Sequence, residues 1–109
     1  MNTAIILAGG TGQRMQQEIP KQFINVNDKP LIIYTLEAFQ KHPKVDCILV
    51  VCIDGWHDIL RAYAKQNGID KLKWIINGGT SGQESIRNGV FALENICKSD
   101  DIIIIHDGI

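Results

Sequence analysis

Four short apolar runs along the chain predict buried strands. They are TAIILA (3–8), CILVVC (47–52), WIIN (74–77) and IIIIH (102–106). Each run is apolar at nearly every position rather than at alternate positions, which is typical of strands covered on both faces. Strands of that kind are found mainly in parallel sheets, so the pattern favours a parallel sheet.

Two longer stretches between these runs carry apolar residues at helical spacing. The first begins near Pro30, a residue favoured in the first turn of a helix, and ends at Lys-His-Pro. Its residues Ile32, Leu36 and Phe39 lie on one side of the predicted helix. The second helix is predicted over roughly residues 56–67, where an Asn-Gly pair is a usual stop signal.

A third helix is predicted over about residues 83–97, with Gly89 as a weak point because glycine is a poor helix former. Strands and helices therefore alternate along the chain, which predicts an α/β fold with a mainly parallel sheet and right-handed crossovers. In such sheets ligands bind outside the carboxyl ends of the strands. Because the chain stops directly after its last strand, we expect residues 1–109 to be the N-terminal part of a single longer domain, incomplete at its C-terminus.

Composition and charge narrow the function classes. With 109 residues and 45% hydrophobic content, the chain is expected to form one globular unit. The net charge of -1 comes from interspersed charges without a basic stripe, so we expect no nucleic-acid partner. The apolar start is too short for a signal peptide or a membrane span. Three cysteines without ligand spacing indicate reduced thiols, and we expect a cytoplasmic protein.

A glycine-rich loop follows the first predicted strand. Gly9, Gly10 and Gly12 allow the backbone to bend closely, and successive N–H groups in such a bend can hold an anion. A phosphate chain is the expected occupant, with an ordinary tight turn as the alternative. The loop is not a Walker A motif, since Gly12 is followed by Gln-Arg, and it is not a dinucleotide fingerprint, since Met15 stands where the third glycine would be.

Two cations, Arg14 and Lys21, flank this loop on its C-terminal side. A guanidinium can bind phosphate oxygens through two parallel hydrogen bonds, and an ammonium group can bring a compact charge to them. Pro20 restricts the backbone directly before Lys21. For either cation taken alone, a solvated surface position is the alternative.

Three segments together resemble a known enzyme family. LAGGTGQRM…IPKQF (7–23), NGGTSGQESIRNG (77–89) and IIIIHDGI (102–109) resemble, in this order, the signature motifs of cytidylyltransferases that act on sugar-alcohol phosphates. These are the 2-C-methyl-D-erythritol 4-phosphate and the ribitol-5-phosphate cytidylyltransferases. The resemblance implies a Rossmann-like, three-layer nucleotidyltransferase fold, a homodimer at full length, and transfer of CMP from CTP to a polyol phosphate with release of pyrophosphate.

The resemblance also implies roles for individual residues. The first loop would wrap the CTP triphosphate through Leu7, Ala8, Gly9, Gly10, Thr11 and Gly12. Arg14 and Lys21 match the pair that stabilises the transition state. Asp107 matches the ligand of Mg²⁺, and a loop or helix-cap aspartate is its alternative.

The second glycine loop resembles the segment that reads cytosine. Gly79, Thr80 and Ser85 stand at the matching positions. Many family members have an acidic residue where this chain has Thr80 and a basic one at Gly82, so the contacts to base and ribose are expected to differ here. For Ser85, ordinary hydrogen bonding at a helix start is an equally good interpretation.

Alternatives to the cytidylyltransferase reading stay open. One is a sugar-1-phosphate nucleotidyltransferase with another nucleotide, against which the IPKQF stretch (19–23) argues. Another is a nucleotide-binding module without transfer activity. Between the two polyol phosphates, LAGG (7–10) and IIYTLEAF (32–39) look slightly more like the ribitol-phosphate branch.

Overall fold

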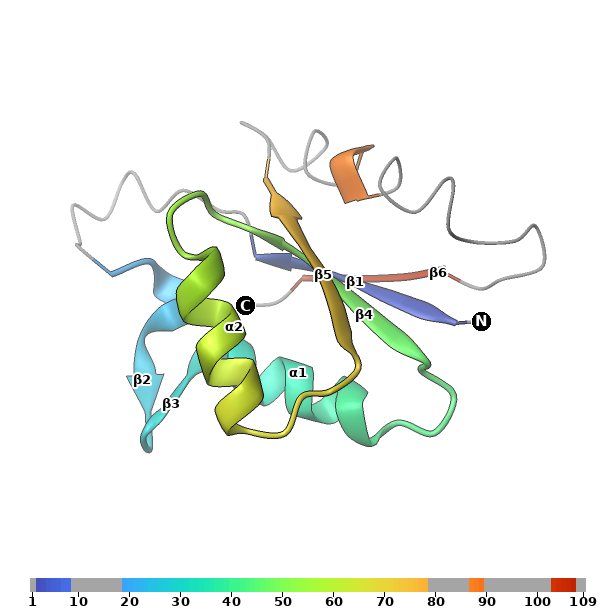
Figure 1. Ribbon diagram of the computed structural model, residues 1–109, viewed down its shortest axis with the longest axis horizontal. Helices are drawn as coiled ribbons and strands as arrows, with labels where there is room; N and C mark the ends of the chain where they lie inside the picture. Colours follow the sequence, from blue (N-terminus) through green and yellow to red (C-terminus); the bar gives the residue numbers. More distant parts are fainter. Residues whose placement is uncertain (1, 9–18, 79–86, 90–102, 108–109) are drawn as a thin grey trace.

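The structure is a computed structural model that describes residues 2–8, 19–78, 87–89 and 103–107 (Figure 1). For Lys21 and residues 103–107 it describes the backbone. Within this part of the chain, no helix is long and apolar enough to cross a membrane.

The described strands form one parallel sheet of four strands, in the order β5-β4-β1-β6, and a separate two-stranded hairpin. The strands of the large sheet are β1 (Thr3–Ala8), β4 (Cys47–Cys52), β5 (Leu72–Asn77) and β6 (Ile103–Asp107). The predicted bounds of β1 and β4 are confirmed. β5 begins earlier than predicted, and β6 is shifted toward the C-terminus by one position, so that Asp107 is its last residue.

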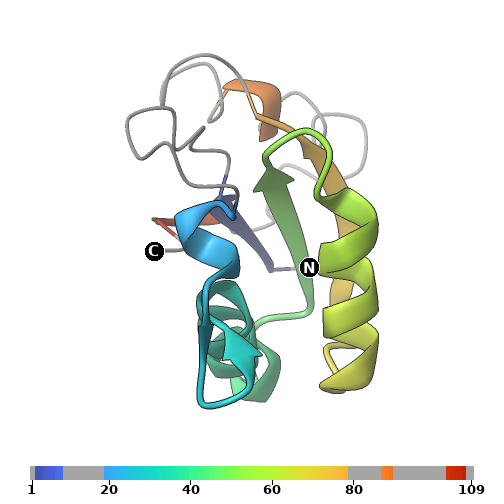
Figure 2. The same cartoon turned by 90° about the vertical axis from the view of Figure 1, so that its left-hand side faces the viewer.

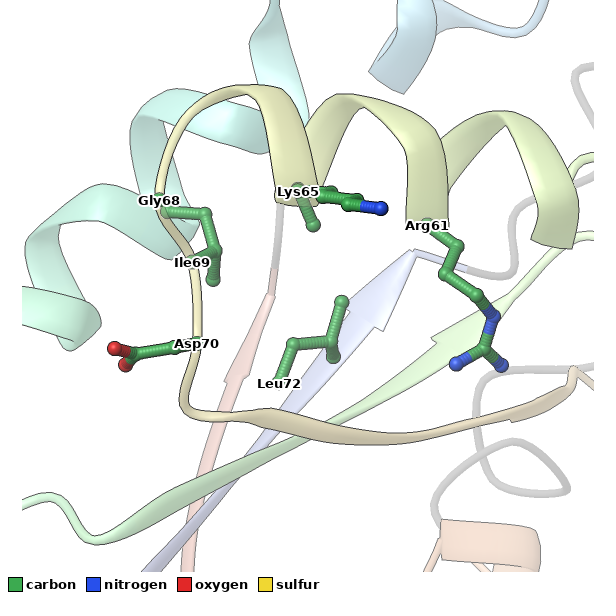
Figure 3. A pocket seen from close by; sticks show the side chains of 7 residues that line it. Arg61, Lys65, Gly68, Ile69, Asp70 and Leu72 are labelled. Atoms are coloured by element: carbon green, nitrogen blue, oxygen red, sulfur yellow. The ribbon is translucent and has the colours of Figure 1, made fainter.

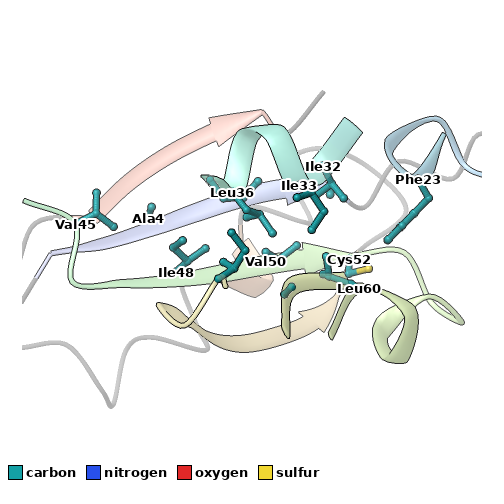
Figure 4. Close-up of a cluster of buried hydrophobic side chains, with 14 residues drawn as sticks. Ala4, Phe23, Ile32, Ile33, Leu36, Val45, Ile48, Val50, Cys52 and Leu60 are labelled. Atoms are coloured by element: carbon teal, nitrogen blue, oxygen red, sulfur yellow. The ribbon is translucent and has the colours of Figure 1, made fainter. Parts of the chain in front are cut away.

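Two helices cover one face of this sheet. The first predicted helix is confirmed as α1 (Leu31–Lys41), which begins directly after Pro30, and the second as α2 (His57–Gln66). Gly68 has a φ of 72°, the left-handed conformation that commonly ends a helix. The core between helices and sheet is a single cluster (Figure 4), whose buried members include Ala4, Ile6, Ile32, Ile33, Leu36, Ile48, Val50, Leu60 and Ala64.

The opposite face of the sheet has its own smaller core. Ile5, Leu49 and Val51 are fully buried there, because alternate residues of a strand point to opposite faces. Residues 87–89 are helical, and a Cβ atom built on Gly89 would lie 3.1 Å from Cγ2 of Ile5 and 3.3 Å from Cγ2 of Val51. A helical turn thus packs directly on this second face. The predicted three-layer α/β arrangement is confirmed.

Two small elements between β1 and α1 were absent from the sequence prediction. A short 3-10 helix, η2, spans Lys21–Phe23, and a hairpin pairs β2 (Asn25–Val26) with β3 (Lys29–Pro30). Asn27 and Asp28, which join the two strands, have positive φ angles of 53° and 69°. Two consecutive left-handed residues are typical of the tight turn that matches the twist of a hairpin.

Candidate functional site

The carboxyl ends of the four parallel strands meet at one edge of the sheet. Ala8 pairs in register with Cys52, and Cys52 with Asn77. On the other side of β1, Leu7 pairs with Asp107. Both glycine-rich segments of the sequence begin at this edge, one directly after β1 and the other directly after β5. We call this region the carboxyl edge, and Figure 2 shows the molecule from the side at which β1 and β4 end.

The first loop starts from a buried strand end. Ala8 is 1% exposed, and its carbonyl oxygen accepts a hydrogen bond of 2.6 Å from Nε2 of Gln22. Leu7 is half-buried and packs against the second core. The two predicted CTP-binding residues that the structure describes in this loop therefore lie at the carboxyl edge, as the sequence predicts.

The η2 turn brings the backbone of Lys21 to the same edge. The N–H group of Phe23 donates to the carbonyl oxygen of Pro20 at 2.9 Å and closes the turn. The ring of Phe23 stacks on Trp56, which follows β4, with a centroid distance of 4.8 Å. Phe23 is 4% exposed, so this contact is part of the core. The backbone of Lys21 therefore belongs to a turn that is attached to the end of β1 and to the start of α2.

The second loop is attached to the edge at its start and at its end. The N–H group of Gly78 donates to the carbonyl oxygen of Cys52 at 3.0 Å. Beyond the loop, Nδ2 of Asn88 donates to the carbonyl oxygen of Asn77 at 3.3 Å, and Gly89 packs on the sheet. Both flanks of the predicted cytosine-reading segment are thus fixed beside β4 and β5.

Asp107 is the residue for which the sequence predicts a role as a magnesium ligand. It ends β6 and pairs in register with Leu7, so its backbone lies close to the start of the first loop. Carboxylate oxygens are the ligands that Mg²⁺ prefers. Within the described ranges, no three His, Cys, Asp or Glu side chains cluster as a metal site. A magnesium ion bound here would share its coordination with oxygen atoms of a phosphate ligand and water, which is usual for Mg²⁺.

A buried thiol lies at the end of β4, in the core between the helices and the sheet. Cys52 is fully buried at the end of β4, and burial raises the pKa of its thiol to about 12, although a hydrogen bond from the Ile53 backbone lowers it. The thiol is therefore uncharged at neutral pH. Cys47 and Cys52 are both buried free thiols, as the sequence predicts, whereas Cys97 lies outside the described residues.

Several predicted site residues cannot be placed in this geometry because they lie outside the described residues. They are Gly9, Gly10, Thr11, Gly12, Arg14, Gly79, Thr80 and Ser85. Their roles stay predictions. The structure places the segments that flank these residues at the carboxyl edge. Leu7, Ala8 and the backbones of Lys21 and Asp107 lie at the same edge.

A surface pocket lies at the opposite edge of the sheet (Figure 3). It has a volume of about 270 Å³ and lies between the last turns of α2 and the start of β5. Its lining residues are Arg61, Ala64, Lys65, Gly68, Ile69, Asp70 and Leu72. Among the described residues, no predicted site residue lines this pocket, which lies at the start of β5, whereas the carboxyl edge lies at its end.

The sequence analysis missed the contacts that hold the edge together. Gln22 and the Phe23–Trp56 stack join segments that are far apart in the chain. Gln22 and Phe23 directly follow the candidate Lys21, but no pattern in the sequence indicates that both side chains are buried.

The chain resembles known cytidylyltransferases over its whole length. The sequence profile of the 2-C-methyl-D-erythritol 4-phosphate cytidylyltransferases (IspD) matches residues 2–109. A ribitol-5-phosphate cytidylyltransferase of Lacticaseibacillus paracasei is 57% identical over 109 residues, covering 100% of this chain and 47% of that protein. A 2-C-methyl-D-erythritol 4-phosphate cytidylyltransferase of Clostridium tetani is 38% identical over 107 residues, covering 98% of this chain and 42% of that protein.

Solved structures agree with the fold. The crystal structure of a 4-diphosphocytidyl-2C-methyl-D-erythritol synthase superimposes with a TM-score of 0.73 at 27% sequence identity. The match covers 98% of this chain and 45% of that one. The chain thus spans just under half the length of the proteins it resembles.

Proposed function

Because the chain belongs to the 2-C-methyl-D-erythritol 4-phosphate cytidylyltransferase family, we propose that the full-length protein transfers CMP from CTP to a sugar-alcohol phosphate and releases pyrophosphate. By full-length protein we mean the encoded chain with any residues that follow Ile109. The observation that carries the proposal is the convergence at the carboxyl edge of the flanks of both glycine loops with Lys21 and Asp107.

Ribitol 5-phosphate is the acceptor that we favour. Relatives named for ribitol 5-phosphate are between 57% and 38% identical to this chain, whereas relatives named for 2-C-methyl-D-erythritol 4-phosphate are between 38% and 34% identical. The two ranges meet at 38%, and the two highest identities, 57% and 46%, belong to ribitol-phosphate enzymes. The same preference comes from the LAGG and IIYTLEAF segments of the sequence.

The reaction requires positive charge close to the α-phosphate of CTP. A phosphate oxygen of the acceptor attacks the α-phosphorus of CTP, its new P–O bond forms, and the bond to pyrophosphate breaks on the opposite side. During this step negative charge spreads over the equatorial oxygens of the α-phosphate. Catalysis therefore consists mostly of positioning the two substrates and stabilising this charge. We assign the stabilising charges to Arg14 and Lys21. The turn that carries Lys21 is held against the strand ends, which supports a fixed position for its backbone.

The remaining residues would bind the nucleotide. Leu7 to Gly12 would wrap the triphosphate with backbone N–H groups. Gly79, Thr80 and Ser85 would line the cytosine. Asp107 would hold Mg²⁺, which when bound neutralises phosphate charge. The buried free thiols Cys47 and Cys52 support a reducing compartment, and we propose the cytoplasm. The homodimer stays a prediction.

Product formation by the purified full-length protein tests the proposal. With CTP, Mg²⁺ and ribitol 5-phosphate we expect CDP-ribitol, identified by mass spectrometry, together with equimolar pyrophosphate. We expect kcat/KM to be higher with ribitol 5-phosphate than with 2-C-methyl-D-erythritol 4-phosphate. Bound CTP without any CDP-alcohol would indicate a binding module instead, and a product from UTP or dTTP and a sugar 1-phosphate would indicate the other class of nucleotidyltransferase.

Single-residue variants in the same assay test whether the assigned residues, rather than other surface cations, are needed for activity. Arg14→Ala and Lys21→Ala should each lower kcat about 10²-fold, the usual loss when one preorganised donor to the transition state is removed. Lys65→Ala is the matched control, because it removes a lysine from the pocket at the opposite edge. It should keep the wild-type kcat, and a loss equal to that of Lys21→Ala would contradict the assigned site.

A further inference from the structure

A buried glutamine lies next to the proposed catalytic lysine. Gln22 is 1% exposed, although glutamine is a polar residue that is normally found at the surface. Burying a primary amide costs free energy unless the amide is hydrogen-bonded. Its Nε2 group donates to the carbonyl oxygen of Ala8 at 2.6 Å, across 14 positions of the chain.

The acceptor of this bond lies at the end of β1, directly before the first glycine-rich segment. Ala8 is the last residue of β1 and is itself 1% exposed, and the first glycine loop begins at the next residue. The bond therefore connects the start of that loop to the η2 turn. Since Lys21 belongs to the same turn, displacement of its backbone from the strand end would stretch or break the bond.

A second contact holds the other end of η2. Phe23 stacks on Trp56, at the start of α2, and the N–H group of Leu31 donates to the carbonyl oxygen of Ile24 at 3.0 Å. The stack ties the turn to the segment after β4, whereas the Gln22 amide ties it to β1. One attachment to β1 and one to the start of α2 leave a three-residue turn little freedom to shift or rotate.

We propose that Gln22 is a positioning residue, whose amide holds Lys21 in fixed relation to the start of the first glycine loop. The inference rests on the proposed function. A cation from one segment and backbone N–H groups from another would then face the same phosphate of CTP, without rearrangement during the reaction. Positioning of this kind matters because a misplacement of about 1 Å can cost about 10²-fold in rate.

The competing explanation is purely structural. A carbonyl at a buried strand end needs a donor, and Gln22 supplies one whatever Lys21 does. The two explanations differ in what happens when the lysine amine is absent. If Gln22 acts through Lys21, its loss costs activity only while that amine is present. If it acts through general stability, the loss is the same in both backgrounds.

The test uses Gln22→Met in the full-length protein, because methionine keeps the length of glutamine and removes the donor. With CTP and ribitol 5-phosphate we expect kcat to fall about 10-fold or more, while KM for CTP stays within about twofold, since the lost effect concerns the transition state. In a Lys21→Ala background the same substitution should change kcat by less than about twofold. Gln22→Asn, whose shorter amide falls short of Ala8, should behave like Gln22→Met.

Gln40→Met is the matched control. Gln40 is also a hydrogen-bonded glutamine, but its amide contacts Asp70 and the backbone of Lys71 at the opposite edge of the sheet. It should leave kcat unchanged. A Gln22→Met loss of equal size with and without the Lys21 amine would overturn the positioning role.

Amide hydrogen exchange separates this inference from the proposed function. The Phe23 amide, which donates to Pro20, should exchange at least about 10-fold faster in Gln22→Met than in Gln40→Met, because the turn has lost one of its attachments. This readout needs no activity. If the wild-type protein forms no CDP-alcohol, the proposed function fails, and the exchange rate still decides whether Gln22 anchors the turn. Unchanged exchange of Phe23 would overturn the anchor itself.

Discussion

At the scale of single residues, the thiol of Cys52 makes the free energy of unfolding depend on pH in the alkaline range. Its pKa is raised from about 9 to about 12 because burial disfavours the thiolate. Between these two values the unfolded chain has lost the proton while the folded protein keeps it. The unfolded state then binds fewer protons, so the free energy of unfolding falls as pH rises. The stabilisation is complete below about pH 9 and disappears toward pH 12.

Denaturant unfolding of the full-length protein between pH 8 and pH 10.5 checks this expectation. Above about pH 9, Cys52 should contribute a decline of about 1.4 kcal/mol per pH unit. Cys52→Ala is less stable at every pH, because it removes a buried group, but its decline should be shallower by that amount. Parallel curves for the two proteins would show that the thiol does not carry the effect.

At the scale of elements, Gly89 allows a helical turn to pack tightly on the sheet. An alanine Cβ at this position would lie 3.1 Å from Ile5 and 3.3 Å from Val51. Both neighbours are fully buried and β-branched, so their side chains have little freedom to move away. Gly89→Ala would gain about 1 kcal/mol of helix propensity, whereas overpacking costs about 1–3 kcal/mol. We expect the cost of overpacking to exceed the gain in helix propensity, so that the variant is less stable.

Thermal unfolding of Gly89→Ala should therefore show a lower Tm than the wild-type protein. Val51→Ala removes one of the two crowding methyl groups. In the double variant Gly89→Ala/Val51→Ala, the combined loss should be smaller than the sum of the single losses, because the cavity and the new methyl group compensate. A raised Tm for Gly89→Ala alone would show that glycine is merely a weak point of the helix, as its propensity indicates.

The large elements were predictable because their patterns are local. β1 is apolar from Ala4 onward, β4 is apolar throughout, and α1 is bounded by Pro30 and His42. The start of β5 was missed because the strand is irregular there: Ile48 pairs with Leu72 but Leu49 pairs with Trp74, so Lys73 is an extra residue. A bulge of this kind interrupts the apolar pattern.

The hairpin was missed for a different reason. Its strands are two residues long, too short to show any periodicity. It is held by contacts with α1: Nζ of Lys29 lies 2.9 Å from a carboxylate oxygen of Glu37, which raises the pKa of Lys29, and the hydroxyl of Tyr34 donates to the carbonyl oxygen of Val26. Asn27-Asp28 was the available signal, because both residues tolerate a positive φ.

The candidate site was predictable in its parts and not in its connections. The order of motifs placed Leu7, Ala8 and Asp107 at strand ends, and the strand register confirms that they share one edge. The Gln22–Ala8 bond was not predictable, because it depends on how a turn folds back over a distance of 14 residues. Single-sequence patterns describe neighbours within a few positions and carry no such information.

At the scale of the whole molecule, the parallel sheet gives its two edges different chemistry. At the carboxyl edge lie the starting points of both glycine-rich segments, the Lys21 turn and the backbone of Asp107. At the opposite edge lies the pocket lined by Arg61, Lys65 and Asp70, among others. Parallel strands bind ligands at their carboxyl ends, partly because every strand there leads into a connection that can be shaped for a ligand. We therefore propose the carboxyl edge as the nucleotide site.

Amide hydrogen exchange of the full-length protein, with and without CTP and Mg²⁺, tests this proposal most directly. We expect slower exchange in residues 8–14, 20–23 and 78–86 on addition of CTP, with unchanged exchange in residues 61–72 around the opposite pocket. GTP at the same concentration should protect the same segments less. Protection confined to residues 61–72, with residues 8–14 and 78–86 unchanged, would show that the nucleotide does not bind at the carboxyl edge.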